Sequence, residues 1–307
     1  METEPGQKKH LFTNKQLWAL LVPVVVEQIL NSLMGTADTM MVSNVGSAAI
    51  SAVSLVDSIN VLVIQVFAAL AAGGTIICSQ YMGQKNTKNA TDAAKQLIFI
   101  ITAIAVVLTV VCVVFQIPLL HLIFGKVEAE VMINSEIYFL YTALSFPFIA
   151  VFNAGSSVFR AQENTRLPMT ISVISNIMNI VGNAILINGW FGMPQLGAVG
   201  AAISTDISKL VGLALMIGMF FKSHRVKMGM SYLRPFPVQI LKNLCLLAIP
   251  TGVESFSYNL SQMMILGIVN SFGTLVTVTK GYCTIFANID YVYAMAIATA
   301  TQIVLAT

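Results

Sequence analysis

The chain has 307 residues, of which 57% are hydrophobic and only 9% are charged, whereas about a quarter of the residues of soluble globular proteins are charged. With a mean hydropathy of +0.82, this composition excludes a soluble globular protein and indicates one that crosses a membrane several times. The net charge of +3 is small and gives no indication of a nucleic-acid partner.

Eight apolar runs are long enough to cross a bilayer, which takes about 20 mostly apolar residues in a helix. They lie near 16–43, 52–80, 96–117, 133–159, 167–189, 197–221, 241–270 and 281–307. The sequence therefore predicts an all-α membrane protein, a polytopic helix bundle embedded in the lipid bilayer.

Lysines and arginines fall almost entirely on one side of this predicted bundle. Thirteen of the sixteen lie at the N-terminus or in every second connection, and only Lys126 and Lys280 lie on the opposite side. Because basic connections remain in the cytoplasm, we predict a multi-pass protein of the plasma (inner) membrane with a cytoplasmic N-terminus.

The first run carries polar side chains that share one helical face. Glu27 and Asp38 are eleven residues apart, about three whole turns, and Asn31 lies between them. An ionised side chain near the bilayer centre costs about 2.5–3.5 kcal/mol on insertion scales, so this face must turn to protein or water. Pro23 frees a backbone carbonyl and predisposes the helix to bend. We interpret the face as a binding site.

Two later runs also carry polar groups in helical register. Asn176, Asn179 and Asn183 form one face of the fifth run, where three amides must bond to another helix or line a cavity. In the sixth run Asp206 and Lys209 are three residues apart, which predicts an ion pair on the helix surface.

The seventh run repeats a feature of the first. Pro250 and Glu254 have the spacing of Pro23 and Glu27, and the same offset of 227 residues aligns further apolar and glycine positions. A constant offset indicates a duplicated bundle, a frequent architecture among transporters.

The repeat predicts four segments. They are a cytoplasmic tail (1–15), a six-helix N-terminal lobe (16–221), a basic cytoplasmic linker (222–240) and a partial C-terminal lobe (241–307). Because the C-terminal lobe would hold only the first two helices of its repeat, we expect the chain to be truncated after the eighth run.

Four segments together carry a family resemblance. They are Thr36–Val42 (TADTMMV), Ser79–Gly83 (SQYMG), Asn188–Ala202 (NGWFGMPQLGAVGAA) and Pro250–Glu254 (PTGVE). In these segments the chain resembles the multidrug and toxic compound extrusion (MATE) transporters, and in particular their NorM-like branch.

The resemblance implies two six-helix lobes around a central cleft, and export of cationic or amphipathic compounds in exchange for sodium ions or protons. It implies a coupling-ion site at Asp38, Asn179, Asn183 and Thr205, with Asp38 as the sodium ligand and no other cofactor. Asn183 stands where one branch often has an aspartate, which favours sodium. Glu254 matches the glutamate of the seventh helix in the NorM-like branch, so the resemblance implies that it binds substrate or a second ion. We assign Glu27 and Tyr258 to the same role. Pro23 and Pro250 are assigned a structural or gating role, because a proline predisposes a helix to bend. Glu27 also has a second interpretation, as a structural partner of another helix.

Other functions stay open at this point. A lipid-linked saccharide flippase of the same superfamily would need many basic residues to bind a pyrophosphate. Inside the apolar runs, acidic residues outnumber the basic ones, among which is Lys209.

An intramembrane enzyme would need a nucleophile with a base, or a metal group. The four cysteines and three histidines do not cluster. This argues against an intramembrane enzyme, against a metal site and against a disulfide framework. An inactive fragment is the remaining alternative. We predict a transporter rather than an enzyme; the sequence does not determine self-association.

Overall fold

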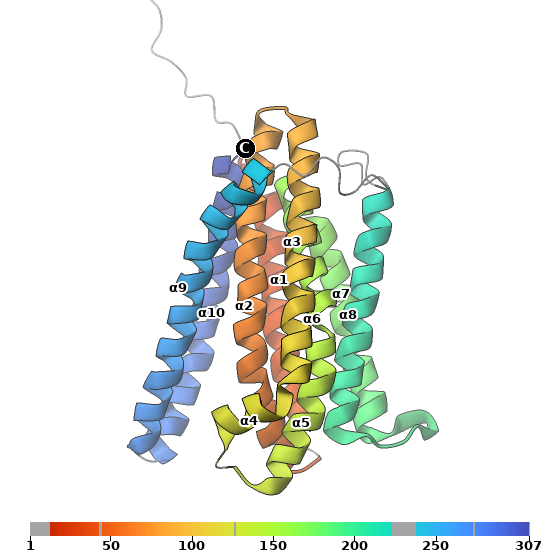
Figure 1. Cartoon of the computed structure of the whole chain (residues 1–307), viewed down its shortest axis with the longest axis vertical. Coiled ribbons are helices and arrows are strands. Elements are labelled where there is room, and N and C mark those ends of the chain that lie inside the picture. The colour runs from red at the N-terminus through yellow and green to blue at the C-terminus, as the bar shows by residue number, and fades with distance from the viewer. Residues whose placement is uncertain (1–12, 43–44, 126, 223–237, 273, 307) are drawn as a thin grey trace, which may run out of the picture.

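The computed structural model describes residues 13–42, 45–125, 127–222, 238–272 and 274–306. Within these ranges the chain forms ten α-helices and one short 3-10 helix, η1 (Figure 1). Their bounds are α1 (Asn14–Val42), α2 (Ser47–Gly83), α3 (Thr87–Val114), α4 (Gln116–Phe124), α5 (Ala129–Leu144), α6 (Phe146–Ala161), α7 (Arg166–Asn188), η1 (Trp190–Gly192), α8 (Gly197–Lys222), α9 (Val238–Ser271) and α10 (Thr274–Ala306).

The all-α membrane fold is confirmed. In the part of the chain that the structure describes, six helical stretches are long and apolar enough to cross a membrane, and each overlaps one of the first six predicted runs. α9 and α10 follow at the seventh and eighth runs, with 34 and 33 residues.

The fourth run forms one helical stretch, Ala129–Ala161, in which the helical hydrogen bonding is interrupted at Ser145. It divides into α5 and α6 at Ser145, two residues before Pro147. The proline has no N–H for the carbonyl of Ala143, and the hydroxyl of Thr109 in α3 donates to that carbonyl instead, at 3.2 Å. The sequence also gave no indication of α4, a short helix between α3 and α5.

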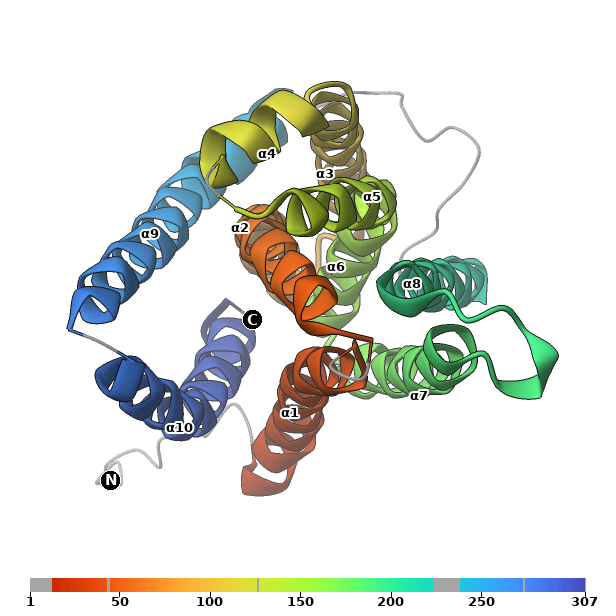
Figure 2. The same ribbon diagram turned by 90° about the horizontal axis from the view of Figure 1, so that it is seen from below.

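α2 lies at the centre of the bundle and packs against α3, α5, α6 and α9 (Figure 2). Phe67 of α2 and Phe146 of α6 are both fully buried, and their rings meet edge to face with centroids 6.4 Å apart. This apolar core fixes α2, α5 and α6 relative to one another, and α7 and α8 lie side by side at its edge.

α9 and α10 form a separate pair on the other side of α1 and α2. α9 packs against α2, and α10 packs against α1 and α2, while both diverge from α2 toward the lower end in Figure 1. α2 begins at Ser47 and α10 at Thr274, which is the 227-residue offset found in the sequence. The predicted tail and linker lie mostly outside the described residues, so the division into segments remains a prediction.

The contact between α7 and α8 depends on a glycine. A Cβ at Gly200 of α8 would lie 2.6 Å from the backbone carbonyl oxygen of Leu186 in α7, an atom that cannot move away alone. We expect Gly200→Ala to destabilise the protein by about 1–3 kcal/mol, the usual cost of overpacking. Unfolding of the purified protein in detergent measures this change.

Gly218→Ala is the matched control, because a Cβ at Gly218, also in α8, meets nothing within 4 Å. This variant should be neutral or more stable by up to about 1 kcal/mol. Equal stability of the two variants would contradict the close approach of α7 and α8.

Candidate functional site

The polar face of α1 turns toward protein, as its spacing predicted. Glu27, Asn31 and Asp38 each accept a hydrogen bond from α6 or α7. The donors are Arg160 Nη2 at 2.7 Å, Ser172 Oγ at 3.2 Å and Asn183 Nδ2 at 2.5 Å, respectively. The sequence predicted this shared face but not these partners.

Four side chains form a continuous hydrogen-bond network across α1, α7 and α8. Asn183 donates to the Asp38 carboxylate and also to Oδ1 of Asn179, at 3.3 Å. Asn179 in turn donates to the Thr205 hydroxyl at 2.9 Å. These are the four residues that the sequence assigned to the coupling ion, and the structure brings all of them together.

The network is closed to its surroundings on the α7 side. Asn179 and Asn183 are both 0% exposed, and the backbone carbonyl of Asn179 accepts a hydrogen bond from Ser204 at 2.9 Å. α7 therefore presents its amides to α1 and α8 in a fixed position, which suits a site that must hold small ligands with defined geometry.

Several buried oxygen atoms at this place have no protein partner. The Oδ1 atoms of Asn183, Asp206 and Asn176 are buried without a hydrogen bond. The amide nitrogen of Asn176, which is a donor, also has no partner. Asn176 lies one turn before Asn179 on the same face of α7. Buried acceptors without donors are costly in a protein interior and are suited to coordinating a cation.

The predicted ion pair between Asp206 and Lys209 is wrong. The structure joins neither residue to the other, although both are described, and Asp206 Oδ1 has no hydrogen bond at all. Two side chains three residues apart in a helix differ by about 60° in their direction around the helix axis, so Asp206 and Lys209 can face different helices.

Glu27 is held by an ion pair. Its Oε1 lies 2.7 Å from Nη2 of Arg160, and the Glu27 side chain is buried. This arrangement supports its interpretation as a structural partner of another helix rather than a residue for substrate or a second ion.

The candidate residues on α9 lie apart from the network. Glu254 is exposed and Tyr258 is 56% exposed, and Pro250 is exposed within α9. α9 packs against α2, whereas the network belongs to α1, α7 and α8. Pro23, by contrast, is buried within α1.

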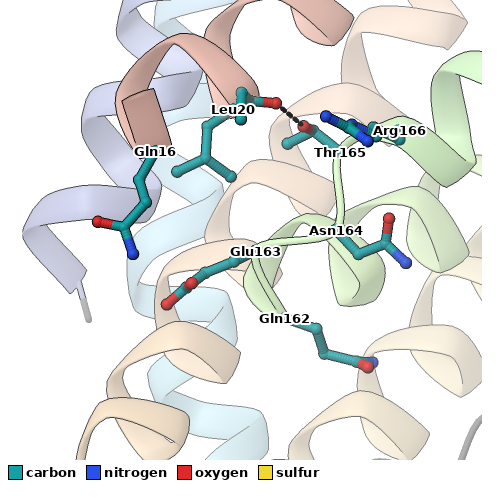
Figure 3. Close-up of a pocket in the computed structure, with 8 residues that line it drawn as sticks. Gln16, Leu20, Gln162, Glu163, Asn164, Thr165 and Arg166 are labelled. Carbon is teal, nitrogen blue, oxygen red and sulfur yellow. Dashed lines mark hydrogen bonds between the residues drawn. The ribbon is translucent and has the colours of Figure 1, made fainter. Parts of the chain in front are cut away.

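A polar cavity of about 470 Å³ lies at the other end of α1 (Figure 3). It is lined by Gln16, Ala19 and Leu20 of α1 and by residues 162–166 of the turn between α6 and α7. Asp38 lies about 28 Å further along α1 than Ala19 at 1.5 Å per residue, so the cavity and the network are separate sites.

The network joins one carboxylate to two amides and a hydroxyl, and the amide nitrogen of Asn183 donates to the carboxylate. Among the described residues, no three histidine, cysteine, aspartate or glutamate side chains come close enough to hold a metal ion. A site with a single formal charge and several amide and hydroxyl oxygens suits a monovalent cation better than a divalent one.

Comparison with known proteins places this chain in a family. The MatE family model matches residues 23–185. The chain is 32% identical over 290 residues to the uncharacterized transporter YisQ of Bacillus subtilis. The aligned region covers 94% of this chain and 63% of YisQ. It is 28% identical over 258 residues to the probable multidrug resistance protein NorM of Thermotoga maritima. That aligned region covers 83% of this chain and 54% of NorM.

A solved structure shares the fold. The outward-facing conformation of a multidrug resistance MATE family transporter of the MOP superfamily superimposes with a TM-score of 0.86 at 21% identity. The match covers 94% of this chain and 63% of that one, so this chain spans less than two thirds of these relatives. Asp38, Asn179 and Asn183 lie inside the range of the family model, whereas Thr205 and Glu254 lie beyond it.

The ion pair between Glu27 and Arg160 generates a stability prediction. Arg160→Met leaves the buried Glu27 carboxylate without its partner and should destabilise the protein by about 3–5 kcal/mol. Adding Glu27→Gln removes the buried charge and should restore most of the lost stability. Unfolding in detergent measures both variants, and a double variant no more stable than Arg160→Met would contradict the pairing.

Proposed function

Because this chain belongs to the MatE family of membrane transporters, we propose that it acts in a secondary active exporter of small cationic or amphipathic compounds. The exporter takes its energy from sodium ions or protons that move in the opposite direction. The single observation that carries this proposal is the hydrogen-bond network of Asp38, Asn183, Asn179 and Thr205, whose two asparagines are fully buried. The names of the relatives, which include multidrug resistance proteins, support the substrate class.

We assign the coupling-ion site to this network. The Asp38 carboxylate supplies the negative charge, and Asn179, Asn183 and Thr205 supply neutral oxygens. Hard cations prefer oxygen ligands of this kind, which favours sodium over a proton. The oxygen of Asn183 that has no hydrogen bond in the protein is an additional candidate ligand.

Ion binding acts on three helices at once. The network joins α1, which also packs against α10, to α7 and α8, which lie on the opposite side of α1 (Figure 2). A cation at Asp38 neutralises the carboxylate and weakens its hydrogen bond with the amide of Asn183 in α7. In this proposal, occupancy shifts the balance between two arrangements of the helices and so gives alternating access.

The substrate site lies outside the network, in this proposal. Glu254 and Tyr258 are exposed on α9, where a carboxylate and an aromatic ring attract a cationic compound. The apolar character of the surrounding helices suits amphipathic compounds of varied shape. Nothing in this arrangement requires a chemical reaction, so we assign transport and no enzymatic activity.

The orientation follows from charge. The start of α1, the α2–α3 turn, the α6–α7 turn and the end of α8 lie at one end of the bundle, the upper end in Figure 1. Most of the basic residues that the structure describes lie at this end, so we propose that it faces the cytoplasm and that the protein lies in the plasma membrane.

Efflux of a cationic dye from energised cells tests the function. We expect cells that express the protein in an efflux-deficient host to extrude ethidium, and Asp38→Asn to reduce efflux at least tenfold, because the amide cannot carry the charge that holds the coupling ion. Immunoblots of isolated membranes must show equal amounts of both proteins.

Asp92→Asn is the matched control. Asp92 forms a partly exposed ion pair with Lys95 near the start of α3, away from the network, and its removal should leave efflux unchanged. Full efflux by the Asp38→Asn variant would overturn the assignment of the ion site. No dye efflux by the unaltered protein would favour the flippase or an inactive fragment.

A further inference from the structure

The loop that joins α7 to α8 is apolar, although it lies at an end of the bundle. Its residues 189–196 read GWFGMPQL, and no charged residue lies between Arg166 and Asp206. Connections between helices ordinarily run over a protein surface in contact with water, where polar side chains prevail. We call residues 189–196 the aromatic loop, and its composition requires a different explanation.

The aromatic loop has a defined conformation. The N–H of Met193 donates to the carbonyl of Trp190 at 3.3 Å, and the N–H of Leu196 donates to the carbonyl of Leu186 in α7 at 2.9 Å. Gly189 has a φ of +71°, which glycine adopts without strain, and a Cβ there would lie 2.9 Å from the carbonyl oxygen of Met193. The backbone therefore holds the side chains of the loop in fixed directions.

Phe191 is an unfavourable choice for the backbone that it occupies. Its φ is +59°, in the left-handed region that side chains with a Cβ rarely adopt and that glycine would fill better. The residue is 90% exposed, so within the described part of the chain its ring gains almost no packing. Folding of the chain alone does not explain an aromatic side chain at this position, whereas a surrounding that receives the ring does.

Two other turns show what the same backbone conformation carries at the opposite end of the bundle. Lys85 in the α2–α3 turn has a φ of +57°, and Glu163 in the α6–α7 turn has a φ of +62°. Both residues are charged and exposed, as expected where a turn faces water. Phe191 has their conformation but the opposite polarity, so its surroundings differ from theirs.

The position of the aromatic loop indicates those surroundings. In both views the loop extends sideways from the ends of α7 and α8, away from the other helices (Figures 1 and 2). α7 has 23 residues and is therefore about 35 Å long, close to the hydrocarbon thickness of about 30 Å. A loop that leaves such a helix sideways lies where hydrocarbon meets the lipid head groups, the level at which tryptophan is enriched.

Lipid also borders the two helices that the loop joins. Apolar side chains without protein cover occur along both of them, as is usual for helices in contact with hydrocarbon. They are Ile177, Ile180, Val181, Ile207 and Leu210. The exposed apolar side chains of the loop extend this lipid-facing surface to the ends of α7 and α8.

We propose that the aromatic loop inserts Trp190, Phe191 and Met193 into the lipid of the leaflet opposite the basic end of the bundle. The Phe191 ring enters the hydrocarbon, and the indole N–H of Trp190 stays among the head groups. The loop thereby holds α7 and α8, which carry three of the four network residues, at a fixed depth in the bilayer. The partner is the bilayer itself, and the proposal does not depend on the transported compound or the coupling ion.

Tryptophan fluorescence of the full chain in phosphatidylcholine nanodiscs tests the proposal. The chain has two tryptophans, so Trp18→Phe leaves Trp190 as the single fluorophore in an otherwise unaltered loop. Lipid brominated on its acyl chains close to the head group should lower the Trp190 emission about twofold or more, because tryptophan at the interface lies within reach of the bromine atoms. Iodide, which stays in water, should quench it only weakly.

A matched pair of variants separates the loop from other exposed turns. In the chain without tryptophan, Trp18→Phe with Trp190→Phe, we add either Phe191→Trp or Lys85→Trp. The two positions share one backbone conformation at opposite ends of the bundle. Brominated lipid should quench the tryptophan at position 191 about threefold more strongly than the one at position 85, and iodide should show the reverse preference.

The contrary results are defined for both measurements. Quenching of Trp190 by iodide but not by brominated lipid would place the loop in water and overturn the proposal. Protection from both quenchers would overturn it as well, because the loop would then be covered by protein, such as a second copy of the chain. Equal quenching of the two paired variants by brominated lipid would show that contact with lipid is not a property of this loop.

Discussion

Polar groups inside a membrane bundle must find their partners in the protein, because hydrocarbon offers none. α1 shows how far this constraint extends in the present chain. From the carbonyl of Ala19 to the carboxylate of Asp38, its polar groups accept hydrogen bonds from α6, α7 and the turn between them. One helix face thus fixes the position of α1 along most of its length, and Asp38, to which we assign the coupling ion, lies on that same face.

The constraint also separates structural from functional polar residues. Glu27 has an opposite charge at 2.7 Å, whereas Asp38 is bonded to a neutral amide whose other atom, Oδ1, has no partner. A carboxylate held by neutral groups retains its ability to bind a cation, whereas one paired with arginine does not. This difference is why we assign the ion to Asp38 and a structural role to Glu27.

Helical register made it possible to predict from the sequence which polar residues share a helix face. Spacing alone placed Glu27, Asn31 and Asp38 on one face and the three asparagines of α7 on another, since 3.6 residues per turn leaves little freedom within a helix. The family resemblance supplied Thr205. Contacts between helices were not predictable, because they depend on rotation and tilt. Arg160, Ser172 and Thr165 were not assigned as partners, and the ion pair expected between Asp206 and Lys209 does not form. The interruption at Ser145 was not predicted, because a proline in a membrane helix can either interrupt the helical hydrogen bonding, as Pro147 does, or be accommodated, as Pro23 is.

Direct binding of radioactive sodium to the purified protein tests whether the Asp38 network binds the coupling ion. We predict saturable sodium binding by the unaltered chain, its loss in Asp38→Asn, and an affinity about tenfold weaker in Asn183→Ala, which lacks one oxygen ligand and one donor to the carboxylate. Sodium binding that is undiminished in Asp38→Asn, or sodium and proton binding that are both absent from the unaltered protein, would contradict the account.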